Sequence, residues 1–198
     1  MRFESLAIEL GTPAPEFSLS SPDGITYTLA DVAGDKATLV AFICNHCPFV
    51  LHVIDGFVGF AREYQDKGLG VVAISSNDVE AHPEDGPEQM AAFAREHGFT
   101  FPYLYDESQE AAKAFKAVCT PDFFLYDGDL KLAYCGQLDS SRPRTEHSNG
   151  ERTCLPVTGE DLRAAADAVI AGRPAPQPQR PSNGCSMKWK AGNEPEWG

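Results

Sequence analysis

The sequence predicts an α/β protein with a central mixed β-sheet flanked by helices, an N-terminal β-hairpin and a C-terminal extension. Short apolar runs typical of buried strands alternate with longer patterns typical of amphipathic helices. Turn signals at two places predict β-hairpins. The expected order is hairpin, β-α-β-α, α, hairpin, α, and the β-α-β crossovers should be right-handed.

The first half of the chain contains the opening hairpin and the first crossover units. Pro22-Asp23-Gly24 supplies a turn with the glycine that such turns need. The two apolar runs after it are bounded by turn residues and are too short for globular helices, so we expect buried strands. In order, we predict strands over 16–20 and 25–28, a strand over 37–43, a helix over 48–67, a strand over 69–75 and a helix over 87–98.

The second half begins with a helix that we expect to start at Asp106, with Gln109 as its capping-box partner. Asp127-Gly128 is a tight-turn signal between strands predicted over 123–126 and 130–134. The polar stretch 140–154 is expected to be a loop. Thr158 is the expected N-cap of a last helix that ends at Gly172. We therefore predict a main domain over 1–172 and a proline-rich extension over 173–198.

Composition excludes several classes of function. The chain has 198 residues, a net charge of −13 and a pI near 4.7. Such an acidic chain is not expected to bind nucleic acid or anionic membranes, both of which need basic side chains. The first residues lack the apolar core of a signal peptide and no stretch is long enough to span a bilayer, so we expect a cytoplasmic protein. Its six cysteines are then expected to be redox-active or buried rather than in structural disulfides.

Two of these cysteines, Cys44 and Cys47, lie directly between the predicted strand 37–43 and the predicted helix that begins at Pro48. Proline is favoured in the first turn of a helix. The free N–H groups and the dipole of a helix start stabilise a thiolate. A C-x-x-C pair at such a corner is typical of redox motifs, whereas the alternative is a pair of buried, inert cysteines.

The arrangement resembles the thioredoxin fold. Cys119-Thr120-Pro121 precedes a predicted strand, where thioredoxin-like proteins place a cis-proline facing the C-x-x-C pair. The segments 11–19 and 101–106 resemble the alkyl hydroperoxide reductase/thiol-specific antioxidant branch. Cys-Asn-His-Cys-Pro at 44–48, Ser-Ser-Asn-Asp at 75–78, Thr-Pro-Asp-Phe-Phe at 120–124 and the terminal 184–190 segment resemble a peroxiredoxin-like subgroup. The resemblance covers nearly the whole chain.

The chain departs from both parent patterns. Thioredoxin has a tryptophan before the first cysteine and a buried aspartate six residues before it, where this chain has Ile43 and Thr38. Counted back from Cys47, the peroxiredoxin threonine position is occupied by Cys44. No arginine lies between Arg95 and Arg142, although peroxiredoxins place one on a later strand. The peroxide-activating triad of that family is therefore not expected here in its usual form.

The expected roles within the pair follow from its position and from the resemblance. We predict Cys44, nearest the helix start and the more exposed, as the attacking thiolate, with Cys47 resolving the mixed disulfide. His46 between them, as an imidazolium, would stabilise the Cys44 thiolate and make the couple more oxidising. Its alternative is a solvent-exposed histidine without a partner. Asn45 is a possible accessory residue of the same motif.

Other residues are expected around the pair. The resemblance implies that Thr120 and a cis-Pro121 form the wall that faces an extended substrate peptide; the alternative is an ordinary trans-proline. Cys119 is either a third redox thiol or a small buried hydrophobe. Asn77 follows a central strand, at the edge where open α/β sheets carry their sites. Cys185 lies in a tail that either folds back on the domain or is mobile.

The sequence thus predicts a thiol-disulfide oxidoreductase that acts on protein or small-molecule thiols and disulfides, without an organic cofactor and with no metal. One alternative is a peroxiredoxin-like thiol peroxidase. A less favoured alternative is a copper-binding chaperone of the same fold, with Cys44, Cys47 and a histidine such as His52 or His147 as ligands. Zinc would need four ligands, and the chain has no second C-x-x-C pair. The sequence leaves the redox partner and the oligomeric state open.

Overall fold

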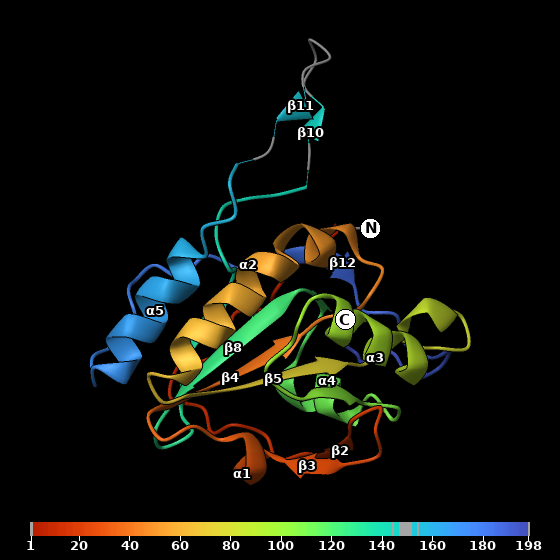
Figure 1. The fold of residues 1–198 in the computed structure, drawn as a ribbon, viewed down its shortest axis with the longest axis horizontal. Coiled ribbons are helices and arrows are strands. Elements are labelled where there is room, and N and C mark those ends of the chain that lie inside the picture. Colours follow the sequence, from red (N-terminus) through yellow and green to blue (C-terminus); the bar gives the residue numbers. More distant parts are fainter. Residues whose placement is uncertain (1, 144, 147–151, 154, 198) are drawn as a thin grey trace.

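A computed structural model describes residues 2–143, 145–146, 152–153 and 155–197. Strands alternate with helices along most of the chain (Figure 1). The helices are α1 (Leu29–Val32), α2 (Pro48–Gln65), η1 (Pro83–Asp85, a 3₁₀ turn), α3 (Pro87–Glu96), α4 (Glu110–Phe115) and α5 (Glu160–Ile170). The strands are β1 (Arg2–Glu4), β2 (Ser18–Ser20), β3 (Thr26–Thr28), β4 (Ala37–Phe42), β5 (Leu69–Ser75), β6 (Tyr103–Tyr105), β7 (Cys119–Thr120), β8 (Asp122–Asp127), β9 (Leu132–Gly136), β10 (Thr145–Glu146), β11 (Arg152–Thr153) and β12 (Asn183–Ser186).

The main sheet has seven strands in the order β3-β2-β6-β5-β4-β8-β9. Its centre is parallel, because β5 pairs with β4 on one side and with β6 on the other in the same direction. The outer strands β2, β3, β8 and β9 pair antiparallel. A second sheet of three strands, β1-β12-β7, joins both ends of the chain to the segment before β8.

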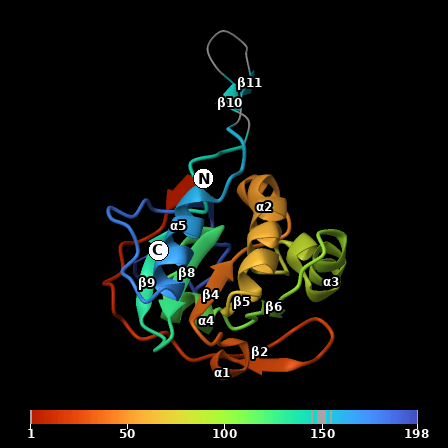
Figure 2. The same cartoon turned by 60° about the vertical axis from the view of Figure 1, so that its left-hand side comes forward.

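The central strand β4 is buried on both faces, which explains its uninterrupted apolar sequence. Leu39 and Ala41 point into a core shared with α2 and α5, whereas Val40 and Phe42 point into a second core shared with α4. Figure 2 shows α2 and α5 side by side on one face of the sheet. The helices therefore cover both faces of a mixed sheet, as the sequence predicts.

Most of the predicted elements are confirmed. The predicted strand 69–75 coincides with β5, and the strand 37–43 and the helix 48–67 correspond to β4 and α2 within one or two residues. Both hairpins form, as β2–β3 and β8–β9. The helix predicted over 87–98 is α3, preceded by the unpredicted turn η1, and the last predicted helix is α5.

Two predicted helix starts are wrong. The helix expected at Asp106 begins at Glu110, because Gln109 adopts the left-handed conformation with φ 64°. The Asp106 carboxylate is instead buried, where it accepts hydrogen bonds from Ser76 Oγ and from the Ala112 backbone. Gly159 rather than Thr158 is the N-cap of α5.

Several short elements were not predicted. They are β1, α1, β6, β7 and β12, together with β10 and β11, which pair inside the stretch expected to be a loop. Residues 144, 147–151 and 154 of that stretch lie outside the described residues. The extension after Gly172 includes β12, which lies between β1 and β7. Among the described residues, no helix has the length and apolar character needed to cross a bilayer.

Candidate active site

Cys44 and Cys47 lie where β4 gives way to α2, as predicted. Cys47 is the N-cap residue of α2 and Pro48 is its first helical residue. Both cysteines are free and buried, with exposed fractions of 1% for Cys44 and 0% for Cys47. Neither cysteine is exposed, so the expectation that Cys44 is the more accessible of the two stays a prediction.

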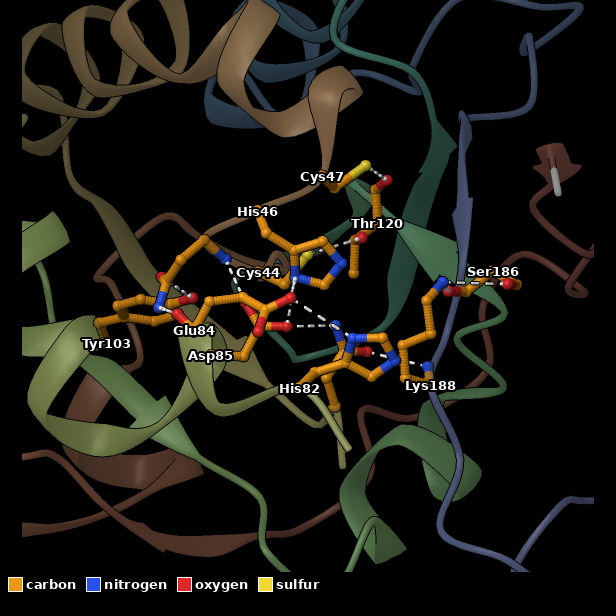
Figure 3. A network of polar contacts seen from close by, with 12 residues as sticks. Cys44, His46, Cys47, His82, Glu84, Asp85, Tyr103, Thr120, Ser186 and Lys188 are labelled. Atoms are coloured by element: carbon orange, nitrogen blue, oxygen red, sulfur yellow. Dashed lines mark hydrogen bonds and ion pairs between the residues drawn. The ribbon is translucent and has the colours of Figure 1, made fainter. Parts of the chain in front are cut away.

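Thr120 contacts both sulfurs (Figure 3). Cys44 Sγ lies 3.3 Å from Thr120 Oγ1, and Cys47 Sγ lies 3.2 Å from the Thr120 carbonyl oxygen. The Thr120–Pro121 peptide bond is cis. The structure thus brings together Cys44, Cys47, Thr120 and Pro121, which the sequence predicted as one site.

The surroundings of Cys47 favour its thiolate. Its pKa is lowered to about 5, chiefly by a hydrogen bond from the Cys44 thiol and further by the Cys185 thiol and the backbone N–H groups of Val50 and Cys185; burial opposes the shift. The Val50 N–H belongs to the first turn of α2, where free donors are available to an anion. These contacts favour deprotonation of Cys47 before Cys44.

Asp85 acts on the other sulfur. The pKa of Cys44 is raised well above its ordinary value by its hydrogen bond to Cys47, by burial and by the Asp85 carboxylate, while the Thr120 hydroxyl opposes the shift. Asp85 is fully buried. These shifts favour a thiolate on Cys47, whereas the sequence analysis predicts Cys44 as the attacking thiolate. The Asp85 carboxylate, which the sequence analysis did not place here, adds to the effects of the Cys47 hydrogen bond and of burial.

His46 is oriented by carboxylates rather than by a thiolate. Its Nδ1 lies 2.8 Å from Asp85 Oδ2 and 3.6 Å from Glu84 Oε1. This close approach does not have the geometry of a hydrogen bond. The ring stacks on His82, with centroids 5.2 Å apart and an interplanar angle of 8°. His46 thus has partners, but its expected stabilisation of a Cys44 thiolate is opposed by the carboxylate it contacts.

Asn45 and Asn77 hold this carboxylate in place. The Asn45 backbone N–H donates to Asp85 Oδ1 over 2.7 Å, and Asn77 Nδ2 donates to Asp85 Oδ2 over 2.7 Å. The Asn45 side chain is fixed by Tyr103 and by the Glu84 carbonyl. Asn77 Oδ1 accepts from the Lys188 backbone N–H over 2.9 Å. Both predicted accessory asparagines therefore position Asp85, and Asn77 also connects it to the C-terminal extension.

The remaining cysteines differ in environment. Cys119 is fully buried and burial raises its pKa well above the ordinary value, which suits the small-hydrophobe interpretation. Burial likewise raises the pKa of Cys135. Cys185 is partly exposed and contacts Cys47 from β12. Cys154 lies outside the described residues.

Side chains that could bind a metal ion lie close together beside the Cys44–Cys47 pair. Cys44, His46 and Asp85 form one group that could hold a metal ion, and His46, His82 and Glu84 form another. His52, considered as a copper ligand with the cysteines, is in neither group and instead lines a small cavity with Phe49 and Pro121. His147, the other histidine considered, lies outside the described residues.

The family profile described as AhpC/TSA matches residues 10–135, which include the cysteine pair and the cis-proline. The chain belongs to the AhpC/TSA family.

Solved structures share the fold of this AhpC/TSA protein. An uncharacterized conserved protein from Geobacillus kaustophilus has 54% sequence identity and a TM-score of 0.89, covering 96% of this chain and 97% of that one. A thiol:disulfide interchange protein DsbE from Chlorobium tepidum, described as putative in its title, has a TM-score of 0.59 at 18% identity over 83% of this chain and 99% of that one. The second likeness shows that this member of the family has a thioredoxin-like fold.

Curated relatives carry two kinds of name. A "Putative peroxiredoxin" of Mycobacterium tuberculosis is 31% identical over 107 residues, which are 54% of this chain and 63% of that protein. The thiol-disulfide oxidoreductase ResA of Geobacillus thermodenitrificans is 26% identical over 129 residues, which are 65% of this chain and 70% of that protein. The family member thus resembles both peroxiredoxins and dithiol oxidoreductases.

Sequence reasoning missed the groups that set the charge of the site. Asp85, Glu84 and His82 lie in a polar segment before α3 that looks like an ordinary surface connection. The one usable signal was the absence of the thioredoxin aspartate at Thr38, which left the usual proton acceptor of this AhpC/TSA protein either missing or supplied elsewhere. Cys185 was noted only as part of a tail of undefined position.

Proposed function

We propose that this protein is a thiol-disulfide oxidoreductase whose working group is the Cys44–Cys47 pair. The observation that carries the proposal is the contact of both sulfurs with Thr120, next to cis-Pro121, at the start of α2. The two sulfurs hydrogen-bond to each other and both contact Thr120. Two cysteines placed in this way can form and open a disulfide without a large movement. Thiols and disulfides are the substrates, whether on proteins or on small molecules.

In the reducing direction, the Cys47 thiolate attacks one sulfur of a substrate disulfide, and the other substrate sulfur leaves as a thiolate. Cys44 then gives up its proton and attacks Cys47 Sγ, so that the Cys44–Cys47 disulfide forms and the second substrate sulfur is released. Two electrons pass from the pair to the substrate. The lowered pKa of Cys47 supports its role as the attacking sulfur.

The test is a redox titration of the wild-type protein against glutathione or dithiothreitol, with the Cys44–Cys47 disulfide followed by alkylation and peptide mapping. We expect a two-electron couple for the Cys44–Cys47 linkage, and we expect this linkage to be absent in Cys44→Ser and unchanged in the control Cys135→Ser. A potential near about −270 mV would mark a reductant, and one near roughly −180 mV an oxidant or isomerase. If no disulfide links Cys44 to Cys47 at any redox potential of the buffer, the proposal fails.

The second candidate is a thiol peroxidase that uses Cys47. The lowered pKa of this sulfur favours it, since peroxides react with thiolates. In this case hydrogen peroxide converts the Cys47 thiolate to a sulfenic acid, and Cys44 condenses with it to the disulfide and water. Peroxide consumption in the presence of dithiothreitol, compared between wild type and Cys47→Ser, decides whether this activity exists.

A cytoplasmic location is part of the proposal and rests on the composition and the cysteine chemistry. Cell fractionation of the untagged protein tests it.

A further inference from the structure

The C-terminal strand β12 occupies the backbone edge beside the cis-proline. It pairs antiparallel with β7, and the register sets Cys185 opposite Thr120 and Ser186 opposite Cys119. Figure 3 shows this strand running past Thr120 on the side of Cys47. The edge predicted to receive an extended substrate peptide is therefore paired with a segment of the same chain, in the manner of strand addition.

The close approach of β12 is built into the sequence at Gly184. A Cβ atom at this position would lie 2.1 Å from the Thr120 carbonyl oxygen, so a larger residue cannot take the same place. Further along the tail, the Met187 N–H donates to the Val118 carbonyl and the Lys188 N–H donates to Asn77 Oδ1. The segment is thus held at several points around the site.

Cys185 brings a third sulfur to the pair. Its backbone N–H and its thiol both hydrogen-bond to Cys47. Unlike Cys44 and Cys47, it is partly exposed. It therefore contacts the buried pair on one side and solvent on the other, in the position that the cysteine of a substrate strand would take.

We propose that Cys185 is a third redox-active thiol, which exchanges internally with the Cys44–Cys47 disulfide and carries the disulfide to the tail. The Cys185 thiolate attacks Cys47 Sγ, the Cys44–Cys47 bond breaks and a Cys47–Cys185 bond forms. Cys44 leaves as a thiolate and takes up the proton that Cys185 lost. No electrons are gained or lost, so no further oxidant is needed. The proposal rests on the proposed dithiol function and extends it to the way electrons enter or leave a covered site.

The charge around Cys185 fits this order of events. In the reduced protein, burial and the neighbouring Cys47 sulfur raise the pKa of Cys185 to about 11, whereas Lys188 lowers it. Once Cys47 is part of a disulfide it carries no charge, so that its contribution disappears and that of Lys188 remains. The Cys185 thiol is thus more easily deprotonated in the oxidised protein, when its attack is needed.

The decisive experiment uses full-length Cys44→Ser protein treated with oxidised glutathione. Cys47 first forms a mixed disulfide with glutathione, and Cys185 then displaces the glutathione as its thiolate. We expect loss of the glutathione adduct and a Cys47–Cys185 linkage in peptide maps. The double variant Cys44→Ser/Cys185→Ser should keep its glutathione, whereas Cys44→Ser/Cys135→Ser should behave as Cys44→Ser does.

Retention of glutathione by Cys44→Ser, to the same extent as by Cys44→Ser/Cys185→Ser, would overturn the proposal. A second measurement does not depend on any variant. Wild-type protein at intermediate redox poise, quenched in acid and alkylated, should yield the Cys47–Cys185 peptide pair beside Cys44–Cys47. If wild-type protein yields only the Cys44–Cys47 disulfide, the internal exchange is contradicted but the dithiol function stands. If wild-type protein yields no Cys44–Cys47 disulfide, the dithiol function itself is contradicted.

Discussion

Asp85, the last residue of η1, carries a fully buried carboxylate beside the C-x-x-C motif. Its two oxygens accept from the Asn45 backbone and from Asn77, and it contacts His46. A carboxylate held in this way in a low-dielectric site opposes a second negative charge nearby. Together with the hydrogen bond between the two sulfurs and with burial, it raises the pKa of Cys44.

Replacing Asp85 should therefore make Cys44 more reactive. In a Cys47→Ser background, Asp85→Asn removes a charge that raises the pKa of Cys44. We expect a several-fold faster alkylation of Cys44 by iodoacetamide at pH 8, with the pH–rate profile moved to lower pH. Asp55→Asn serves as control, because Asp55 is exposed and pairs with the distant His97. An identical profile with and without Asp85 would show that its charge does not act on Cys44.

Asp122, the residue after cis-Pro121, should make the free energy of unfolding depend on pH. It is fully buried, and burial raises its pKa to about 8, although the hydroxyls of Ser182 and Ser5 partly offset this shift. The folded protein therefore keeps a proton that the unfolded chain loses near its ordinary pKa of about 4. The stabilisation is fully present below that value and is lost as the pH rises to about 8.

We expect the free energy of unfolding of wild type, relative to Asp122→Asn, to fall by a few kcal/mol between pH 4 and 8, at about 1.4 kcal/mol per pKa unit. Urea unfolding at several pH values measures it. Asp129→Asn, in the exposed turn after β8, is the matched control. Parallel pH profiles of wild type and Asp122→Asn would refute the assigned protonation.

At the scale of elements, β12 depends on Gly184. Gly184→Ala places a Cβ against the Thr120 carbonyl and should displace the strand, with a loss of about 1–3 kcal/mol of stability as for other overpacked sites. Because β12 covers the cysteine pair, we expect faster alkylation of Cys47 in the same variant. Gly59→Ala, on the exposed face of α2 where a Cβ meets nothing, should be neutral or slightly stabilising. Unchanged alkylation in Gly184→Ala would mean that β12 does not limit access.

The same elements show what could be predicted from the sequence. The run 37–43 forms β4 because a strand buried on both faces must be apolar throughout, and that pattern is visible locally. β12 has no such pattern: asparagine and glycine at its start disfavour strands, and it is stabilised only by pairing with β1 and β7. The burial of Asp85 could not be predicted for a similar reason. It depends on hydrogen bonds from Asn77 and Asn45, which belong to other segments of the chain.

At the scale of the whole molecule, the two ends of the chain meet at the active site. β12 lies between β1 at the N-terminus and β7 beside cis-Pro121. Gln109, at the start of α4, also holds the tail, since its side chain donates to the Lys188 carbonyl and accepts from the Lys190 N–H. The extension predicted over 173–198 is therefore packed against the rest of the chain.

A chain that ends at Gly172 tests what the packing of the extension contributes to stability and to the burial of the cysteines. It lacks β12, so β1 loses its partner and the edge of β7 is free. We expect a lower unfolding temperature and faster alkylation of Cys44 and Cys47 in the reduced state, since β12 packs beside the cysteine pair in the full chain. A chain ending at Asn193 keeps β12 and the Gln109 contacts and should match the full-length protein in its alkylation rates. If the shorter chain alkylates and unfolds as the full-length protein does, the extension is a separate appendage and the cover over the cysteines must come from residues 1–172.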